Sequence, residues 1–157
     1  MKKILVVLIF LVMIVLFKPA VFSHCEIPCG IYNDEMRFTM IEEHIKTIEK
    51  AMKEIEHLSG HQPPNFNQIV RWVTNKEKHA EEIQHIISQY FLTQRVKLVE
   101  KEDDKAHAIR TKHLSLCHEI LVFAMKTKQT TDLSNVEKLK SAVKAFKDSY
   151  LNAKAKK

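Results

Sequence analysis

Apolar residues recur every three or four positions along four separate stretches of this 157-residue chain. That spacing places them on one face of an α-helix and leaves the opposite face to charged residues. The four apolar faces are Ile41, Ile45, Ile48, Met52 and Ile55; Ile69, Val73, Ala80, Ile83, Ile87 and Tyr90; Ile109, His113, Leu116, Ile120 and Phe123 or Ala124; and Val136, Leu139, Val143, Phe146 and Tyr150. The pattern therefore predicts four amphipathic helices.

Capping and breaking residues separate these helices. Gly60 suits the carboxyl end of a helix, and Pro63 and Pro64 cannot continue one, so the first helix ends close to Gly60. The residues that could cap the helix starts are Asn33 or Asp34, Asn65, Asp103 or Asp104, and Asp132 or Ser134. Residues 93–104 are so rich in charge that the end of the second helix stays open, and we expect the lysine-rich residues 152–157 to fray into solvent.

Helices that each carry a single apolar face have to bury that face against one another. Four of them joined by short polar loops predict an all-α fold, an antiparallel up-down four-helix bundle. The two glycines and four prolines of the chain are too few for the turns of an all-β fold. No repeat of about 30 to 50 residues indicates a solenoid.

Residues 1–23 have the pattern of a cleaved secretion signal peptide. Two lysines precede an apolar run over residues 4–17, which is short for a membrane span, and the triplet V-F-S gives a signal peptidase a site to cut before His24. The alternatives are an uncleaved signal anchor and a lipoprotein acylated at Cys25, but the residue before that cysteine is bulky where lipoprotein signals need a small one. We therefore expect an exported mature domain, residues 24–157, in the periplasm or outside the cell, without stable membrane association after cleavage.

The mature chain has little net charge. Residues 24–157 contain 22 Lys and Arg against 19 Asp and Glu, a net charge of +3, and the basic residues are interspersed with acidic ones. Nothing in this distribution predicts a nucleic-acid partner. Three cysteines are an odd number for an exported protein, so a disulfide framework cannot use all of them. Cys117, beside Leu116 on an apolar face, is expected to be a buried thiol.

The first six residues after the predicted cut offer five metal donors. His24 would supply its α-amine and its imidazole, Cys25 a thiolate and its backbone amide nitrogen, and Cys29 a second thiolate. Two thiolates favour a soft or borderline transition metal. An amine, an amide and two thiolates from so short a segment form a flat set, which suits Ni(II) or Cu(II) better than the tetrahedron that Zn(II) prefers. Pro28 and Gly30 fit the turn that folds this segment back on itself.

Residues 24–32 read H-C-E-I-P-C-G-I-Y. This segment resembles the nickel hook of the nickel-containing superoxide dismutases, whose pattern is H-C-x-x-P-C-G-x-Y at the mature amino terminus. The order of elements, a metal-binding hook followed by an antiparallel four-helix bundle, is also similar to that family over residues 24–157. The resemblance implies one nickel ion per subunit with His24, Cys25 and Cys29 as ligands, the His24 imidazole being axial.

The resemblance also implies roles for residues around the metal. Tyr32 matches the tyrosine that restricts access to small anions, and Tyr90 resembles a second tyrosine that supports this gate. Glu42 or Glu43 would orient the axial imidazole. Glu26 stands where the best-known branch of the family has an aspartate, and the second helix shows no clear basic partner for the imidazole where that branch has an arginine. In that branch a separate protease removes a short leader inside the cell, so the predicted export signal is another departure.

The implied activity is the conversion of superoxide, a small-molecule substrate, to O₂ and H₂O₂ by Ni(III)/Ni(II) cycling. The resemblance further implies a homo-oligomer, a hexamer. Two interpretations without turnover compete with the enzyme: a secreted nickel- or copper-binding helical protein whose hook is only a chelator, and a structural helical protein with a Cys25–Cys29 disulfide. A chelator has no need of Tyr32, which favours the enzyme.

Overall fold

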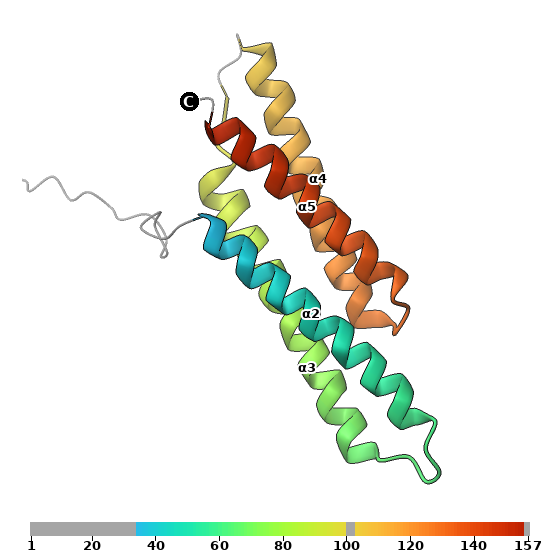
Figure 1. The fold of residues 1–157 in the computed structure, drawn as a ribbon. Helices are drawn as coiled ribbons and strands as arrows, with labels where there is room; N and C mark the ends of the chain where they lie inside the picture. Colours follow the sequence, from blue (N-terminus) through green and yellow to red (C-terminus); the bar gives the residue numbers. More distant parts are fainter. Residues whose placement is uncertain (1–33, 100–102, 156–157) are drawn as a thin grey trace, which may run out of the picture.

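The computed structural model describes residues 34–99 and 103–155 of the chain. The described residues form four α-helices and one π-helical segment, with no strand among them (Figure 1): α2 (Asp34–Ser59), α3 (Phe66–His85), η1 (Ile86–Arg95), α4 (Asp104–Gln129) and α5 (Ser134–Ala155). The predicted all-α four-helix bundle is confirmed. The predicted signal peptide, residues 1–23, lies outside the described residues.

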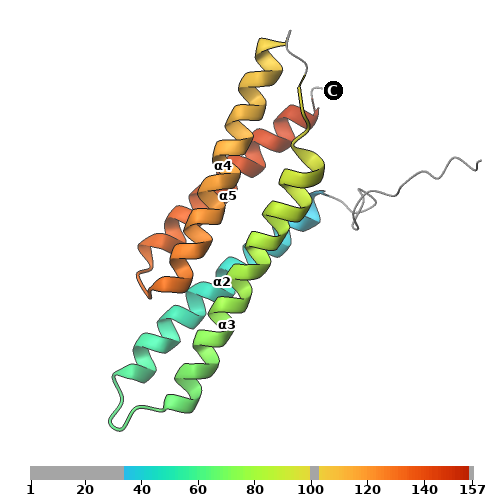
Figure 2. The same ribbon diagram turned by 180° about the vertical axis from the view of Figure 1, so that it is seen from behind.

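The helices form two antiparallel hairpins that pack against each other. Each helix packs against its neighbours in the chain, and α5 closes the bundle against α2. Figures 1 and 2 show that the α2–α3 hairpin and the α4–α5 hairpin are displaced along the long axis, so that the α2–α3 loop lies beyond the α4–α5 loop. No helix in the described ranges is long and apolar enough to cross a membrane.

The predicted capping residues begin three of the helices. The Asn65 side chain accepts a hydrogen bond from the backbone N–H of Gln68, 3.2 Å away, at the start of α3. The Asp103 side chain accepts one from the Ala106 N–H at 2.8 Å, and Asp132 accepts from the N–H of Ser134 at 2.9 Å. Each carboxylate or amide satisfies a backbone donor that the first turn leaves without an internal partner.

The centre of the core is a group of three aromatic rings from three different elements. Phe38 of α2, Phe91 of η1 and Phe146 of α5 are all fully buried. Their ring centres lie 4.8 Å apart for Phe38–Phe91, 5.0 Å for Phe91–Phe146 and 5.6 Å for Phe38–Phe146. Such tilted and edge-on contacts add to the burial of the rings. These rings join the two hairpins where α2, η1 and α5 meet.

Two of the predicted apolar faces are buried only along part of their length. The faces of the first and fourth helices are buried as predicted. In the second and third helices the prediction was wrong at Val73 and Ile109, each of which is 37% exposed. Val73 lies in the half of α3 that follows the α2–α3 loop. Ile109 lies near the start of α4, where it lines a pocket together with Asp34 of α2 and Tyr150 of α5.

A buried lysine joins α3 to the carboxyl end of α4. Lys76 is 4% exposed, and its Nζ donates to the backbone carbonyls of Lys128 at 2.7 Å and Thr130 at 3.2 Å. The last carbonyls of a helix lack internal donors and carry partial negative charge, so a lysine is a favourable partner. Burial lowers the Lys76 pKa, although the neighbouring Glu77 carboxylate opposes the shift.

A pair of histidines connects α2 to α3. The Nδ1 atoms of His44 and His79 lie 2.7 Å apart, so one ring has to donate its proton and the other to accept it. Burial is the largest cause that lowers the pKa of both rings; the charge of His79 lowers the His44 pKa further, and Glu82 opposes the shift on both. The folded protein therefore favours the neutral rings.

We expect the free energy of unfolding to fall as the pH drops below about 6.5, the ordinary histidine pKa. The unfolded chain binds protons there that the folded His44–His79 pair resists, so stability is complete above that pH and is lost on acidification. Urea unfolding at about pH 5.5 and pH 7.5 measures the loss. The His44→Gln, His79→Gln double variant should show a weaker pH dependence, whereas the exposed control His118→Gln should not. Equal pH dependence in all three proteins would contradict the prediction.

Replacing Phe91 with alanine should lower the free energy of unfolding by about 3–5 kcal/mol, because the cavity lies among rings that cannot collapse onto it. Urea unfolding measured by circular dichroism gives the value. The control Met125→Ala, at a residue that is 41% exposed on α4, should change it by no more than about 0.5 kcal/mol. A loss below about 1 kcal/mol for Phe91→Ala would contradict the packing described above.

Candidate metal centre and its attachment to the bundle

The predicted hook, residues 24–32, lies outside the described residues. This covers its predicted ligands, its turn residues and its gate: His24, Cys25 and Cys29, then Pro28 and Gly30, then Tyr32. Their roles therefore stay predictions. Within the two described ranges, no group of three or more His, Cys, Asp or Glu side chains could hold a metal ion. What the structure does describe is the place where the chain enters the bundle after the hook.

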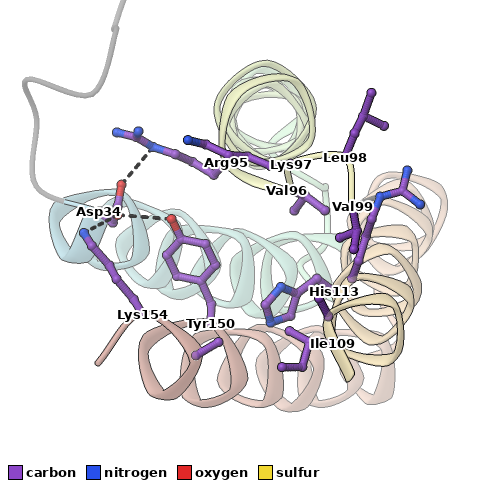
Figure 3. Close-up of a pocket in the computed structure, with 13 residues that line it drawn as sticks. Asp34, Arg95, Val96, Lys97, Leu98, Val99, Ile109, His113, Tyr150 and Lys154 are labelled. Carbon is purple, nitrogen blue, oxygen red and sulfur yellow. Dashed lines mark hydrogen bonds and ion pairs between the residues drawn. The ribbon is translucent and has the colours of Figure 1, made fainter. Parts of the chain in front are cut away.

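That place is Asp34, the first residue of α2, whose carboxylate is buried, with 3% of the residue exposed. Its Oδ1 accepts a hydrogen bond from the Tyr90 hydroxyl and lies 3.1 Å from Arg95 Nε in an ion pair. Its Oδ2 accepts hydrogen bonds from the Tyr150 hydroxyl at 3.1 Å and from Lys154 Nζ at 2.7 Å. Figure 3 shows Arg95, Tyr150 and Lys154 converging on this carboxylate. We call these five residues the Asp34 cluster.

The π-helical segment η1 brings two members of the cluster together. Arg95 Nη2 donates to the Tyr90 hydroxyl at 2.9 Å, and its guanidinium lies over the Tyr90 ring, 4.8 Å from the ring centre. In an α-helix with 3.6 residues per turn, positions five apart point roughly 140° from each other. The π turn is wider, with backbone bonds five residues apart such as Val96 N–H to Phe91 C=O at 2.8 Å. This geometry helps both side chains to reach one carboxylate.

In the Asp34 cluster the carboxylate is ionised and the two tyrosines are neutral. Burial alone would raise the Asp34 pKa, but the hydrogen bonds from Lys154 and Tyr90 and the charge of Arg95 outweigh it and hold the pKa below its usual value. Burial, and next the hydrogen bond to Asp34, raise the Tyr90 pKa, so this hydroxyl keeps its proton. Burial also raises the pKa of Tyr150.

A pocket of about 500 Å³ opens beside the Asp34 cluster. Its polar lining includes Lys97 and Arg110 in addition to Asp34, Arg95 and Lys154, so its described basic side chains outnumber the acidic ones. His113 lies on its wall (Figure 3), where its Nε2 is 3.2 Å from Ser149 Oγ and burial lowers its pKa. Such a lining favours small anions over cations at this end of the bundle.

The described residues among the predicted site residues divide into three cases. Tyr90 is 2% exposed and belongs to the Asp34 cluster. Its hydroxyl donates to Asp34, which follows the predicted gate residue Tyr32 by two positions. Glu42 forms an ion pair with Lys147 of α5 at 2.7 Å, and Glu43 is exposed. Their predicted role beside the imidazole stays a prediction.

Cys117 is confirmed as a buried thiol. It is fully buried on α4, and desolvation raises its pKa to about 12. At neutral pH the thiol therefore stays protonated, which makes it a poor metal ligand and a poor nucleophile.

Four members of the Asp34 cluster were not identified as site residues from the sequence, and one of them, Tyr150, was expected only on the apolar face of the fourth helix. Asp34 was expected only as a helix cap, and Arg95 fell in the charged stretch whose structure the pattern left open. Lys154 was expected to fray into solvent, which was wrong: α5 continues to Ala155 and Lys154 binds Asp34. The useful signal was the position of Asp34, two residues after the last residue of the hook, at the start of the helix that follows a metal-binding motif.

Comparison with known families places this geometry in context. The family model described as nickel-containing superoxide dismutase matches residues 19–154. The matched range begins before the predicted hook and ends one residue before the end of α5, so it includes the hook pattern and every member of the Asp34 cluster. Searches of curated proteins and of solved structures found no match.

Proposed function

Because the chain belongs to the family of nickel-containing superoxide dismutases, we propose that its nickel is bound by the amino-terminal hook, residues 24–32. Membership makes the protein an enzyme that has a nickel cofactor and acts on superoxide. The observation that carries the proposal is the match over residues 19–154, which spans the complete H-C-x-x-P-C-G-x-Y pattern together with the helices.

The donor set of the hook fits nickel. Cys25 and Cys29 offer two thiolates, and His24 offers an imidazole and, once the leader is removed, an α-amine. With the backbone amide of Cys25, these donors suit the flat coordination that Ni(II) prefers. Cleavage before His24 completes the set, because an uncut chain has a peptide nitrogen at that position instead of an amine.

The bound metal supplies one-electron chemistry between Ni(III) and Ni(II), by which two superoxide anions and two protons become O₂ and H₂O₂. The residues of the chain bind the metal and orient its ligands. Pro28 and Gly30 shape the hook, Tyr32 limits access to small anions, and Glu42 or Glu43 orients the imidazole. Tyr90, whose hydroxyl is held on Asp34, supports the gate from the bundle. The basic lining of the adjacent pocket suits an anionic substrate.

Mature protein loaded with nickel should remove superoxide, and Cys25→Ser or Cys29→Ser should reduce the rate to that of the nickel-free protein, because each loses a thiolate ligand. Stopped-flow decay of superoxide, with nickel content by mass spectrometry, measures this. The control Cys117→Ala removes a buried thiol that is not part of the hook pattern and should keep nickel and activity. Tight nickel binding without superoxide loss would instead support the chelator, and a nickel-free protein with a Cys25–Cys29 disulfide would support the structural interpretation.

We also propose that residues 1–23 are a cleaved export signal and that the enzyme works in the periplasm or outside the cell. The two lysines and the short apolar run support this. Amino-terminal sequencing of the protein recovered from outside the cytoplasm is the direct observation. A first residue other than His24 would remove the amine ligand from the proposed site.

A homohexamer is the proposed assembly, and an exposed apolar surface on α3 supports self-association. Phe66 is 70% exposed, Val70 62% and Val73 37%, and their spacing of four and three places them on one face of α3. This face, which we call the α3 stripe, lies on the part of the α2–α3 hairpin that extends beyond the α4–α5 loop (Figure 1). Apolar groups gathered on one exposed face are typical of protein contact surfaces.

The double variant Phe66→Ser, Val70→Ser should shift the protein from hexamer towards smaller species, because it removes the two most exposed side chains of the α3 stripe. Light scattering after size-exclusion chromatography measures the mass. The control Met125→Ser changes an exposed apolar residue on α4 and should leave the assembly intact. A wild-type protein that is monomeric at micromolar concentration would overturn the hexamer.

A further inference from the structure

The Asp34 cluster holds one carboxylate from two sides. Oδ1 faces Tyr90 and Arg95 of η1, and Oδ2 faces Tyr150 and Lys154 of α5. A single contact would let the first turn of α2 pivot about it. Two pairs of donors on two different elements remove that freedom, so both the position and the rotation of the start of α2 are fixed.

A second contact between α2 and η1 lies one turn further along. The Arg37 guanidinium lies over the Tyr90 ring, 5.1 Å from its centre, and Arg95 lies over the same ring at 4.8 Å. In cation–π contacts of this kind, each guanidinium is attracted to the electron-rich face of the ring. The Tyr90 side chain is therefore bound to the first turn of α2 through both its hydroxyl and its ring.

The fixed point is close to the hook along the chain. An extended chain spans at most about 3.6 Å per residue. The Cα atom of Tyr32 therefore cannot lie more than about 7 Å from the Cα atom of Asp34, and that of Cys29 cannot lie more than about 18 Å from it. Catalytic groups are sensitive to placement, and a shift of about 1 Å can cost about 100-fold in rate. Whatever fixes Asp34 therefore bears on where the metal ligands and the gate can lie.

We propose that Asp34 is a positioning residue for the nickel centre: its carboxylate, held by η1 and α5, sets where and in which direction the hook leaves the bundle. The inference rests on the proposed function of the hook. Asp34 acts through the chain and the cluster, with no contact to substrate. All four of its described donors come from the bundle, and its lowered pKa keeps it ionised, so it does not serve as a proton donor at neutral pH.

The test compares Asp34→Asn with wild-type enzyme, both loaded with nickel. Asparagine keeps the shape but loses the charge that Arg95 and Lys154 bind. Since the nickel donors all belong to the hook, we expect nickel content to stay near wild type while kcat/KM per nickel falls about 10–100-fold, the range seen for residues that orient metal ligands. The electron paramagnetic resonance spectrum of the oxidised protein should change, because a displaced imidazole alters the metal environment.

Two comparisons separate positioning from loss of stability. Asp148→Asn, an exposed acid of α5 paired with Lys144, is the matched control and should leave activity and spectrum unchanged. If Asp34→Asn does not fold, Lys154→Met replaces it, because the Lys154 side chain is 63% exposed and its loss removes one donor only. Here we expect a smaller change in the same direction. A folded variant with wild-type kcat/KM and a wild-type spectrum per nickel would overturn the proposal.

The same experiment distinguishes a failure of the proposed function from a failure of the inference. A nickel-loaded wild-type protein that leaves superoxide untouched would contradict turnover at the hook. The Ni(II)–thiolate absorption and circular dichroism bands still report the geometry of the metal site in that protein. Bands shifted in Asp34→Asn but not in Asp148→Asn would support the positioning role, and bands unchanged in both would overturn it.

Discussion

The end of the bundle where α2 begins depends on the hydrogen bonds and ion pairs of one buried carboxylate, that of Asp34. Burying a charge costs several kcal/mol in lost hydration, and removing one partner of a buried ion pair is more harmful than never having had the pair. Asp34 meets this cost with two basic side chains and two hydroxyls. The Tyr150 ring continues from the cluster into the aromatic core, 5.5 Å from Phe91. The charged cluster and the apolar centre are therefore parts of one packing unit.

The helices were predictable because their signals are local. Apolar spacing and capping residues act within one or two turns, and Asn65, Asp103 and Asp132 cap where the sequence indicated. The exposure of Val73 and Ile109 was not predictable, since it depends on how the two hairpins pack against each other. The π geometry of η1 has no known local pattern comparable to a helical stripe, and it determines how Arg95 reaches Tyr90.

The proposed metal ligands and the Asp34 cluster differ in the same way in how far the sequence predicts them. The hook can be predicted from the sequence because five potential donors fall within six residues, and the chemistry of these donors favours a small set of metals. In the Asp34 cluster, the carboxylate binds Tyr90, Tyr150 and Lys154. These residues follow Asp34 in the sequence by 56, 116 and 120 positions. Spacing along one chain cannot reveal such contacts. A lysine three positions before the last residue of the sequence is expected to be solvated, until the fold brings it to a buried acid.

Two buried charges give the two hairpins a directional connection. Apolar packing is non-directional, so the ring contacts alone would tolerate some sliding of α4–α5 along α2–α3. Asp34 of α2 binds Tyr150 and Lys154 of α5, and Lys76 of α3 binds the carbonyls at the end of α4. Each hairpin thus contributes to both contacts. A slide would take both donors from Asp34 Oδ2, although Oδ1 would keep Tyr90 and Arg95 of η1, and it would take both carbonyl acceptors from the buried Lys76 ammonium, which is costly. These contacts therefore favour the observed displacement of the hairpins, and those of Asp34 also hold the start of α2 against α5.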